Sequence, residues 1–423
     1  MLKLNYFKIT RFLIYFNFLF PTFNSVFSDA DFGVGPLFIH FILTFVCLLC
    51  IFLRNPPISK PIKMGLLFFY LFFIIISSST LFTPNIIIIR DLFELHRPFY
   101  YGSAFILPLT LHWEKDGISR YIIKPIFICF IFLLVLGLST LLSSDVIELV
   151  LGLYTKSGNV RTGRASGTFT NPYDYGFMMT FAVNLFLNSA LVCKQAAKKI
   201  VFVSLSLLSA LVILMSQSRT AMIVFAFSLL YFMVVTIFLN NDVKKALKSF
   251  VIYVSGLLIG LLNVDRILAY VEHNYRYLYY GISGLLTRGI EGTGSSATRF
   301  RQLEFAWDAL ASRPLIGNGP SKDVAEFLEM QYSLYIYRYG IPGMLIVLLY
   351  IVYSFIVSLK ALVKINKYTE NARIKSFFVS MHVWCAILPV AFWGNPFIDM
   401  PRISFFFFFM MGLLTALLRQ DMN

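Results

Sequence analysis

Apolar runs of about twenty residues alternate with short polar connections along most of the chain. We place these runs at 12–28, 34–53, 64–82, 86–111, 121–142, 176–193, 200–216, 221–240, 249–264, 332–359, 376–396 and 402–419. Runs of this length can cross a hydrocarbon core of about 30 Å as helices, and helices are favoured because lipid offers backbone groups no hydrogen-bond partners. The pattern predicts an all-α polytopic membrane protein with about twelve transmembrane helices, in which residues 1–423 form a single integral membrane domain.

The composition supports a membrane protein and argues against a soluble enzyme. Of the 423 residues, 58% are hydrophobic and 13% charged, and the mean hydropathy is +0.76, whereas a soluble domain carries roughly 25% charged residues. No small-residue cleavage site follows the first run, so we expect it to be a membrane anchor rather than a signal peptide. The five cysteines lie in or beside apolar runs, so we expect no disulfide or zinc site from them.

Basic residues are sorted between the two sides of the predicted membrane. Twenty-one of the 36 Lys and Arg residues fall on the side of the chain ends, and 16 of these are Lys; of the other 15, 13 are Arg. Because cytoplasmic loops carry an excess of basic residues, this pattern predicts that both termini are cytoplasmic. The net charge of +15 is then mostly a topology signal and does not indicate nucleic-acid binding; contact with anionic membrane lipid accounts for the lysines.

Two of the predicted extracytoplasmic loops are much longer than the other connections. They cover about 143–175 and about 265–331, the second with nearly seventy residues. Long loops of this kind usually carry function. Transporters instead place their sites near the bilayer midplane, on broken helices.

The first long loop ends in a segment that combines arginine with small residues. Arg161 and Arg164 precede Gly167, and Asn171-Pro172 indicates a turn that starts the next helix. The planar fork of arginine can grip phosphate oxygens in a bidentate way, and glycine permits close backbone approach. A phosphate-binding segment and a solvated basic loop are both consistent with this pattern.

Arg219 lies in a short hinge, Ser218-Arg219-Thr220, between two apolar runs at the predicted outer surface. A charged residue so close to hydrocarbon is costly and tends to be functional or paired. It would contact the same cavity as Arg164, or it would be an interfacial anchor whose charged end reaches water.

The second long loop contains six arginines and one lysine. Within it, residues 299–310 show helical spacing, with Phe300, Leu303, Trp307 and Leu310 on one face. This pattern predicts an amphipathic helix on the outer membrane surface or over a cavity. A helix stop and turn follow at 312–320, and the segment from Glu329 enters the tenth run.

Charged residues also interrupt the fourth run. Arg90 is spaced to pair with Glu94, and Asp91 lies near both Glu94 and Arg97. Charges within a span suggest function, but a self-neutralised structural network is an equally good interpretation. Arg338, near the start of the tenth run, would join the same cavity.

Four of these segments, in this order, resemble the superfamily of O-antigen polymerases (Wzy-type) and O-antigen ligases. They are the Arg-x-x-Gly-x-Phe-x-Asn-Pro motif at 164–172, the hinge at 218–220, the stretch at 299–319 that ends in Pro-Leu-Ile-Gly-Asn-Gly, and the segment at 329–343. Each motif alone is loose. Together they cover roughly 164–343 on a chain with the expected number of apolar runs and a large outer loop.

The resemblance implies a metal-independent glycosyltransferase without cofactors at the outer face of the bacterial cytoplasmic membrane. Its donor would be a glycan on undecaprenyl diphosphate, and its acceptor a second lipid-linked repeat unit in polymerases or lipid A–core in ligases. Ligase relatives usually carry a His–Asn pair before the span that ends in Gly-x-x-Gly, whereas Glu329 and Met330 stand there in this chain. Polymerase relatives tend to show an acidic residue at that place, so a polymerase is favoured.

The chemistry of such a transfer suggests roles for particular residues. Arginines can neutralise the departing diphosphate, and our candidates are Arg164, Arg219, Arg299 and Arg301, with Arg161 and Arg288 as further ones. Glu329 is the first candidate for the general base, with His273 and Asp323 as rivals. One base and no covalent nucleophile imply inversion. Asn171, His273 and Arg338 complete the candidate substrate contacts.

Two functions of other classes remain open. A lipid-linked oligosaccharide flippase would also have about twelve spans and a cationic cavity, although the seventy-residue loop and the lack of an internal repeat argue against it. A non-catalytic assembly partner would need extended coiled-coil segments, and we find none. The expected partners are the lipid-linked glycan, membrane lipid and, through the resemblance, a chain-length regulator and a flippase.

Overall fold

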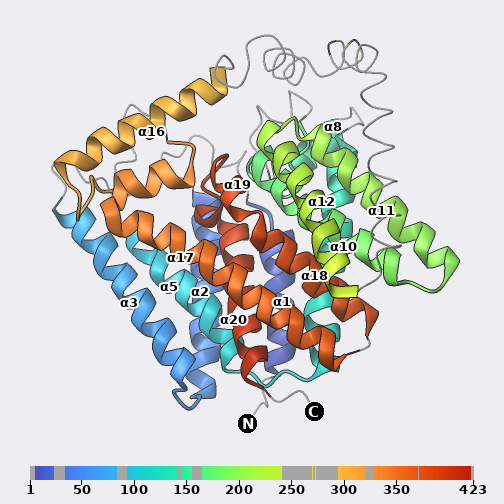
Figure 1. Ribbon diagram of the computed structural model, residues 1–423. Coiled ribbons are helices and arrows are strands. Elements are labelled where there is room, and N and C mark those ends of the chain that lie inside the picture. The colour runs from blue at the N-terminus through green and yellow to red at the C-terminus, as the bar shows by residue number, and fades with distance from the viewer. Residues whose placement is uncertain are drawn as a thin grey trace.

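The computed structural model describes residues 5–22, 34–82, 93–140, 145–154, 164–240, 269, 272, 294–320, 328–369 and 371–420. In these ranges the chain is helical and contains no strand (Figure 1). Seven helices within them are long and apolar enough to cross a membrane. The all-α membrane architecture is thus confirmed, while the predicted number of about twelve spans is not shown. The ninth predicted run, 249–264, lies outside the described residues.

The helices and their bounds follow the chain in this order. They are α1 (Tyr6–Leu19), α2 (Val34–Arg54), α3 (Lys60–Leu81), η1 (Phe93–His96), α5 (Arg97–Leu109), α6 (Lys115–Ile118), η2 (Ser119–Ile123), α7 (Lys124–Ser139), α8 (Asp145–Gly152), α10 (Pro172–Val192), α11 (Ala196–Met215), α12 (Arg219–Asn240), α16 (Gly294–Ser312), α17 (Gln331–Tyr368), α18 (Ala372–Ala386), α19 (Leu388–Phe392), η3 (Phe397–Asp399) and α20 (Pro401–Arg419).

The first helix does not lie where the apolar pattern placed it. The run was predicted at 12–28, but α1 begins at Tyr6, because the Asn5 side chain caps it by accepting the Lys8 N–H at 3.1 Å. The helix ends at Leu19, and Phe20 is extended. Pro21 follows directly, and proline disfavours helical geometry in the residue before it.

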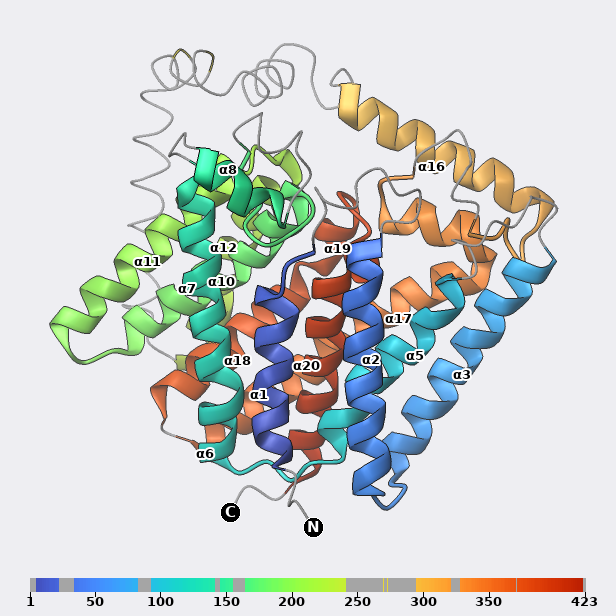
Figure 2. The ribbon, with the colours of Figure 1, turned by 180° about the vertical axis from the view of Figure 1, so that it is seen from behind.

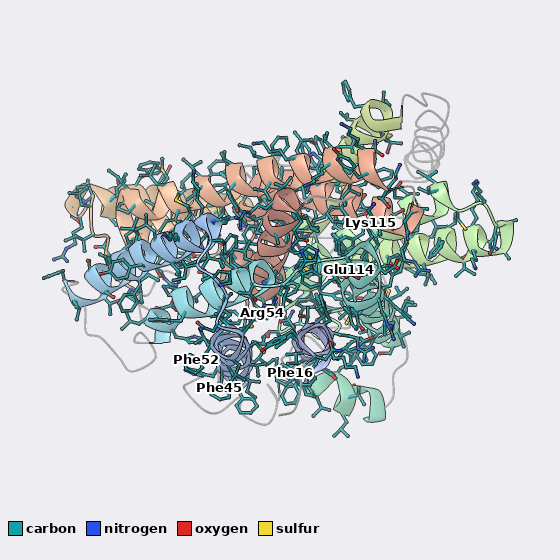
Figure 3. The ribbon with its side chains drawn as sticks, turned by 90° about the horizontal axis from the view of Figure 1, so that it is seen from below. Phe16, Phe45, Phe52, Arg54, Glu114 and Lys115 are labelled. Atoms are coloured by element: carbon teal, nitrogen blue, oxygen red, sulfur yellow. The ribbon has the colours of Figure 1, made fainter. Side chains whose placement is uncertain are left out.

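Helix α20 lies in the middle of the bundle, between α1, α5 and α17 (Figures 1 and 2). Its run Phe405–Phe409 is buried on every side, and the ring centroid of Phe408 lies 4.4 Å from that of Tyr101 on α5. The outer helices instead expose large apolar side chains. Phe45 and Phe52 of α2 point away from the bundle and are 67% and 80% exposed (Figure 3), which is suited to contact with lipid.

One end of the bundle holds both described chain ends and the starts of α1, α3 and α6, which carry Lys8, Lys60 and Lys115 (Figures 1 and 2). Here Lys364 of α17 donates hydrogen bonds from Nζ to the carbonyl oxygens of Leu417, Leu418 and Gln420, at 3.0, 3.1 and 2.6 Å. The last carbonyls of a helix have no partner within it and carry partial negative charge. Lys364 therefore fastens the C-terminus of α20 to α17.

The opposite end is covered by α16, which lies across the start of α17 (Figure 1). The predicted helix therefore exists, and polar residues take part in the side of it that packs on the bundle. Arg299, Gln302 and Ala306 are buried, whereas Phe300 and Trp307 are 40% and 46% exposed. Phe300 and Trp307, two members of the predicted apolar face, therefore lie on the outside of the bundle, while contacts of Arg299 and Gln302 hold the helix against it.

Candidate functional site

A tight turn between α19 and η3 is the point where the predicted motifs meet. We call Trp393, Gly394 and Asn395 the 393–395 turn. The Asn395 side chain donates to the Asp174 carboxylate of α10 at 2.7 Å, and Arg299 of α16 donates to the Gly394 carbonyl at 3.3 Å. Thr220 of the hinge packs so closely on Gly394 that a Cβ there would overlap its side chain. The turn thus joins α10, α12 and α16.

The Arg-x-x-Gly-x-Phe-x-Asn-Pro segment rests on the hinge between α11 and α12. Arg164 Nε donates to the Ser216 carbonyl at 3.2 Å, and the Ala165 N–H donates to the Met215 carbonyl at 3.1 Å. The Arg164 guanidinium also lies over the Tyr173 ring, 5.3 Å from its centroid. Arg164 is therefore held beside the residues that lead into Arg219.

The local sequence explains how both segments are shaped. Asn171 caps α10, accepting the Asp174 N–H at 3.0 Å, and Pro172 is the first helical residue. This confirms the predicted helix start. The Ser218 hydroxyl oxygen accepts the Ala221 N–H at 3.2 Å, which caps α12 in the same way. The hinge thus places Arg219 at the first residue of α12, and the other segment carries Arg164 eight residues before the start of α10.

The guanidinium of Arg299 and the carboxylate of Glu329 form an ion pair. Arg299 Nη2 lies 3.4 Å from Glu329 Oε2; the arginine side chain is 9% exposed and the glutamate side chain 36%. The Gln302 side chain accepts the Glu329 N–H at 3.0 Å. The pair brings together the two motifs that the sequence placed on the second loop, and it leaves the carboxylate open to solvent.

A kink in α17 at Gly340 is held by the segment 314–319, which contains Gly317 and Gly319 and precedes Glu329 in the sequence. Gly340 has φ 65° and ψ −149°, a conformation essentially restricted to glycine. The carbonyls freed at the kink accept hydrogen bonds from the 314–319 segment, because the N–H of Asn318 donates to Tyr337 O at 2.8 Å and that of Gly319 donates to Arg338 O at 3.1 Å. The Pro-Leu-Ile-Gly-Asn-Gly motif is therefore a backbone clamp on α17.

Replacing Gly340 with Ala is expected to destabilise the protein strongly. The new Cβ would overlap the Pro314 carbonyl, and an alanine at this φ and ψ adds about 1–3 kcal/mol of backbone strain. Thermal unfolding of the purified protein should show a Tm well below that of wild type. The control is Gly117→Ala, where a Cβ would meet nothing within 4 Å. Equal Tm values for both variants would contradict the clamp.

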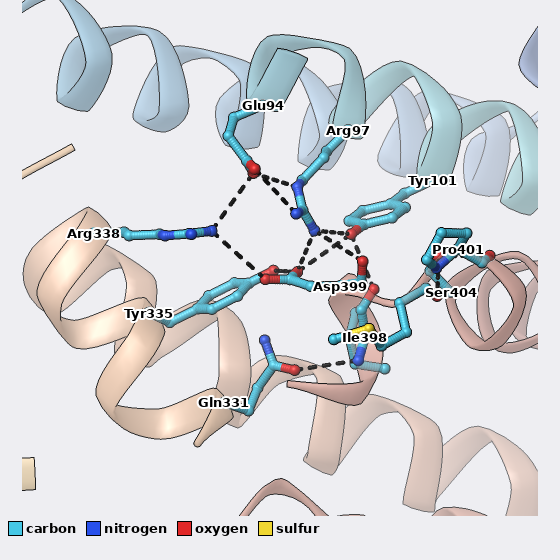
Figure 4. Close-up of polar contacts among 11 residues, drawn as sticks. Glu94, Arg97, Tyr101, Gln331, Tyr335, Arg338, Ile398, Asp399, Pro401 and Ser404 are labelled. Atoms are coloured by element: carbon cyan, nitrogen blue, oxygen red, sulfur yellow. Dashed lines mark hydrogen bonds and ion pairs between the residues drawn. The ribbon is translucent and has the colours of Figure 1, made fainter. Parts of the chain in front are cut away.

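A buried group of four charges lies beneath this end of the bundle (Figure 4). This four-charge cluster consists of Glu94, Arg97, Arg338 and Asp399. Arg97 bonds to both carboxylates, with Nη1 2.8 Å from Asp399 Oδ1 and Nη2 3.1 Å from Glu94 Oε1. Arg338 lies 3.7 Å from Glu94 and 4.0 Å from Asp399. Two positive and two negative charges balance one another.

Tyrosine and glutamine side chains complete the surroundings of the four-charge cluster. The hydroxyls of Tyr335 and Tyr101 donate to Asp399 Oδ1 at 2.8 and 3.3 Å. The Gln331 side chain accepts the Ile398 N–H at 3.2 Å. These contacts tie η3, and with it the 393–395 turn, to α5 and α17. The pairing of Glu94 with Arg97 and Arg338 supports a self-neutralised network; the proposed partners Arg90 and Asp91 lie outside the described residues.

The structure brings some of the sequence candidates together and separates others. Arg164 and Arg219 lie at the hinge, and Arg299 and Glu329 form a pair. Arg301 is exposed on α16 and donates to the Thr298 hydroxyl at 3.3 Å. Arg338 is bound in the four-charge cluster. The candidates that fall outside the described residues are Arg161, His273, Arg288 and Asp323.

Sequence reasoning missed the 393–395 turn and Asp399. The run at 376–396 was predicted as one span, but α18 ends at Ala386 and α19 is short. The Gly394-Asn395-Pro396 sequence, a strong turn signal within that run, was available to find the break. Asp399 lay between two predicted spans and gave no such signal, since its burial depends on α5 and α17.

Among the described residues, two apolar hollows lie between the helices, and the larger one reaches Pro98, next to Arg97 of the four-charge cluster. They have volumes of about 240 and 830 Å3 and are lined almost wholly by apolar residues of α2, α3, α5, α17 and α20. None of the candidate residues that the structure describes lines either hollow, so the polar contacts define the site.

The fold and the site together define a polytopic helical membrane protein with arginines and a carboxylate gathered at one end. Residues 204–348 match the family model of the O-antigen ligases (Wzy_C). This part of the chain, from α11 to α17, is similar to that family, which covers O-antigen ligases and Wzy polymerases, enzymes that transfer glycan from lipid-linked donors. No curated protein matches the chain.

Proposed function

We propose that this protein polymerises undecaprenyl-diphosphate-linked repeat units into O-antigen or a similar surface polysaccharide. The observation that carries the proposal is the Arg299–Glu329 pair at the entrance to α17. An acidic residue stands where the ligase pattern has a His–Asn pair, and this supports a polymerase. Transfer to lipid A–core by a ligase is the alternative within the same family.

In the proposed reaction, a hydroxyl oxygen of the acceptor sugar attacks the anomeric carbon of the donor glycan. The bond from that carbon to the diphosphate oxygen breaks, and undecaprenyl diphosphate leaves with the bonding electron pair. Glu329 accepts the proton of the attacking hydroxyl as general base. A single displacement of this kind inverts the anomeric centre, and it needs no covalent intermediate on the protein.

Arginines stabilise the charge that develops on the leaving diphosphate in this proposal. Arg164, Arg219 and Arg299 lie on three segments that contact one another through the hinge and the 393–395 turn. Preorganised cations act strongly on a developing charge because they need no reorganisation during the reaction. Arg301, Arg161 and Arg288 are proposed as further contacts to the glycan or the diphosphate.

Two residues predicted to contact substrate, Asn171 and Arg338, make structural interactions within the protein. Asn171 caps α10, and Arg338 is bound to Glu94 and Asp399. A direct contact of Arg338 with substrate would require those ion pairs to break. We therefore propose that both residues act by holding the segments that carry Arg164 and Glu329.

The direct test is to give the purified protein its own host's lipid-diphosphate-linked repeat unit in detergent with EDTA and no other acceptor. A ladder of longer lipid-linked glycans would support a metal-independent polymerase. No ladder, but transfer after lipid A–core is added, would identify a ligase instead. Failure of both reactions, together with movement of the substrate across vesicle membranes, would favour the flippase.

We also propose that the end with α16 and the 393–395 turn faces outward from the cytoplasmic membrane and that both termini are cytoplasmic. The lysine-rich end carries the described chain ends, in agreement with the positive-inside rule. Cysteines placed at the exposed positions Glu148 and Glu304 should react with a membrane-impermeant maleimide in intact cells, and one at Lys360 should react only after lysis. The reverse pattern would overturn the orientation.

Replacing Arg164 with Lys is expected to lower kcat/KM although the charge is kept. Lysine cannot reproduce the bidentate fork, and losing a charge-assisted hydrogen bond of about 1.5–3 kcal/mol corresponds to a loss of about 10- to 100-fold. Rates of ladder formation measure the effect. The control is Arg120→Lys, an exposed arginine at the opposite end. Full activity of Arg164→Lys would remove bidentate binding from the proposal.

A further inference from the structure

Two aromatic rings stand exposed beside the Arg299–Glu329 pair. Trp393 of the 393–395 turn is 37% exposed, and Phe300 of α16 is 40% exposed. Their ring centroids lie 5.4 Å apart with an interplanar angle of 67°. The rings touch edge to face and leave open aromatic surface toward their surroundings. We call them the Trp393–Phe300 pair.

The backbone that carries this pair is fixed by the contacts of the candidate site. Phe300 follows Arg299, whose guanidinium bonds to Glu329 and to the Gly394 carbonyl. Trp393 precedes Gly394, which packs on Thr220, and Asn395 is bound to Asp174. Phe300 is therefore the neighbour of Arg299 in the chain, Trp393 is the neighbour of Gly394, and the Arg299 guanidinium bonds both to Gly394 O and to Glu329, the proposed proton acceptor.

Exposed aromatic rings on a rigid backbone are well suited to binding sugar. The C–H bonds on one face of a pyranose ring carry partial positive charge, and the face of an aromatic ring is negative. Aromatic side chains with a few placed polar groups are the usual lining of sites for small organic ligands. Arg299 and Glu329 supply such polar groups beside the Trp393–Phe300 pair.

We propose that the Trp393–Phe300 pair is a sugar-binding subsite that holds a pyranose ring at the reacting end of the lipid-linked glycan. The inference rests on the proposed function and adds to it the residues that grip the carbohydrate rather than the diphosphate. It also assigns a purpose to the exposure of Phe300 on α16.

Trp307 serves as a comparison residue, because exposed tryptophans can also anchor a protein at the membrane interface. It lies seven residues after Phe300 on α16, about 10 Å further along the helix axis, and is 46% exposed. Tryptophans of this kind are common at membrane interfaces, where they contact lipid headgroups. Trp307 has no ring contact with Trp393 or Phe300 among those that the structure describes. It should therefore serve as an anchor without contacting the sugar.

Tryptophan fluorescence can test sugar binding apart from catalysis. Of the four tryptophans, Trp113 and Trp384 are buried, so Trp307 and Trp393 are the two that solutes can reach. The probe is the soluble oligosaccharide repeat unit released from the host polysaccharide, added to the full chain in lipid nanodiscs. It should protect wild type and Trp307→Phe from acrylamide quenching, and this protection should be absent in Trp393→Leu. Protection that persists in Trp393→Leu would overturn the subsite.

Kinetics on the lipid-linked substrate provide the second readout. Trp393→Leu and Phe300→Leu should each raise KM by about 3- to 10-fold, as expected for an aromatic contact of about 0.5–1.5 kcal/mol, with kcat changed little. Because the two residues lie on different elements, misfolding of one variant leaves the other as the test. Trp393→Phe should recover part of the loss, and Trp307→Leu should keep the wild-type KM.

The outcomes separate the subsite from the proposed function. If wild type forms a glycan ladder and both leucine variants keep its KM, the subsite is wrong and the polymerase stands. If wild type neither extends nor binds the glycan, the proposed function fails with it. If brominated lipids quench Trp393 as strongly as Trp307, and the oligosaccharide does not relieve this quenching, the ring is a membrane anchor and the subsite is overturned.

Discussion

Replacing Glu329 with Gln is expected to lower turnover of the lipid-linked substrate by about 10²- to 10⁴-fold, the usual contribution of a general base. Glutamine keeps the size of the side chain and can still accept a hydrogen bond from Arg299, so the 3.4 Å contact need not be lost. Donor binding, measured as retention of labelled lipid-linked repeat unit on the purified protein, should stay within a few fold of wild type.

The control for this variant is Glu304→Gln on α16. Glu304 is exposed and is not part of the Arg299–Glu329 pair. Its rate of ladder formation should equal that of wild type. Normal turnover in Glu329→Gln would remove Glu329 as the base and direct attention to His273 or Asp323. A parallel fall in donor binding and in turnover would instead assign Glu329 to substrate binding.

Replacing Asp399 with Leu is expected to cost about 3–5 kcal/mol of stability, because it leaves one buried positive charge without compensation. In wild type, Asp399 accepts from Arg97 at 2.8 Å and from the Tyr335 hydroxyl at 2.8 Å. Both contacts are lost in the variant. The Tm of the purified protein and the yield of folded protein should fall together.

A double variant distinguishes charge balance from loss of packing. In Asp399→Leu with Arg338→Met, Arg97 keeps its bonds to Glu94, and the cluster is again neutral. Removing both members of a buried pair is often nearly neutral, whereas removing one is strongly destabilising. Most of the lost Tm should therefore return. A double variant less stable than Asp399→Leu would show that the four-charge cluster does not act through charge balance.

Two of the predicted motifs form local structures that the sequence pattern indicates directly. Asn171-Pro172 and Ser218-Arg219-Thr220 shape helix starts by local hydrogen bonds that span three residues, and such short-range patterns can be recognised in sequence. Glu329 was selected by its position in a motif, and the structure places it beside Arg299. Its role as base remains a prediction.

Other features of the structure depend on polar contacts that the apolar pattern does not show. Residues 299–310 were correctly predicted as helix, and contacts of Arg299 and Gln302 decide which side of it packs on the bundle. The run at 376–396 was predicted as one span, although the 393–395 turn interrupts it. Hydrophobicity reports which segments enter the membrane, but it does not identify the partner of a buried polar group.

The sequence by itself determined the all-helical membrane class, the approximate positions of many of the helices, the separation of lysines from arginines and the resemblance to the O-antigen ligase family. These features depend on segment length, local capping and composition. Only the tertiary structure decided which distant residues meet: Asp174 with Asn395, 221 positions apart, and Arg97 with Asp399, 302 positions apart. Such pairs form because a charged or amide group inside the bundle must find a partner there, and that partner can come from any helix that packing brings near.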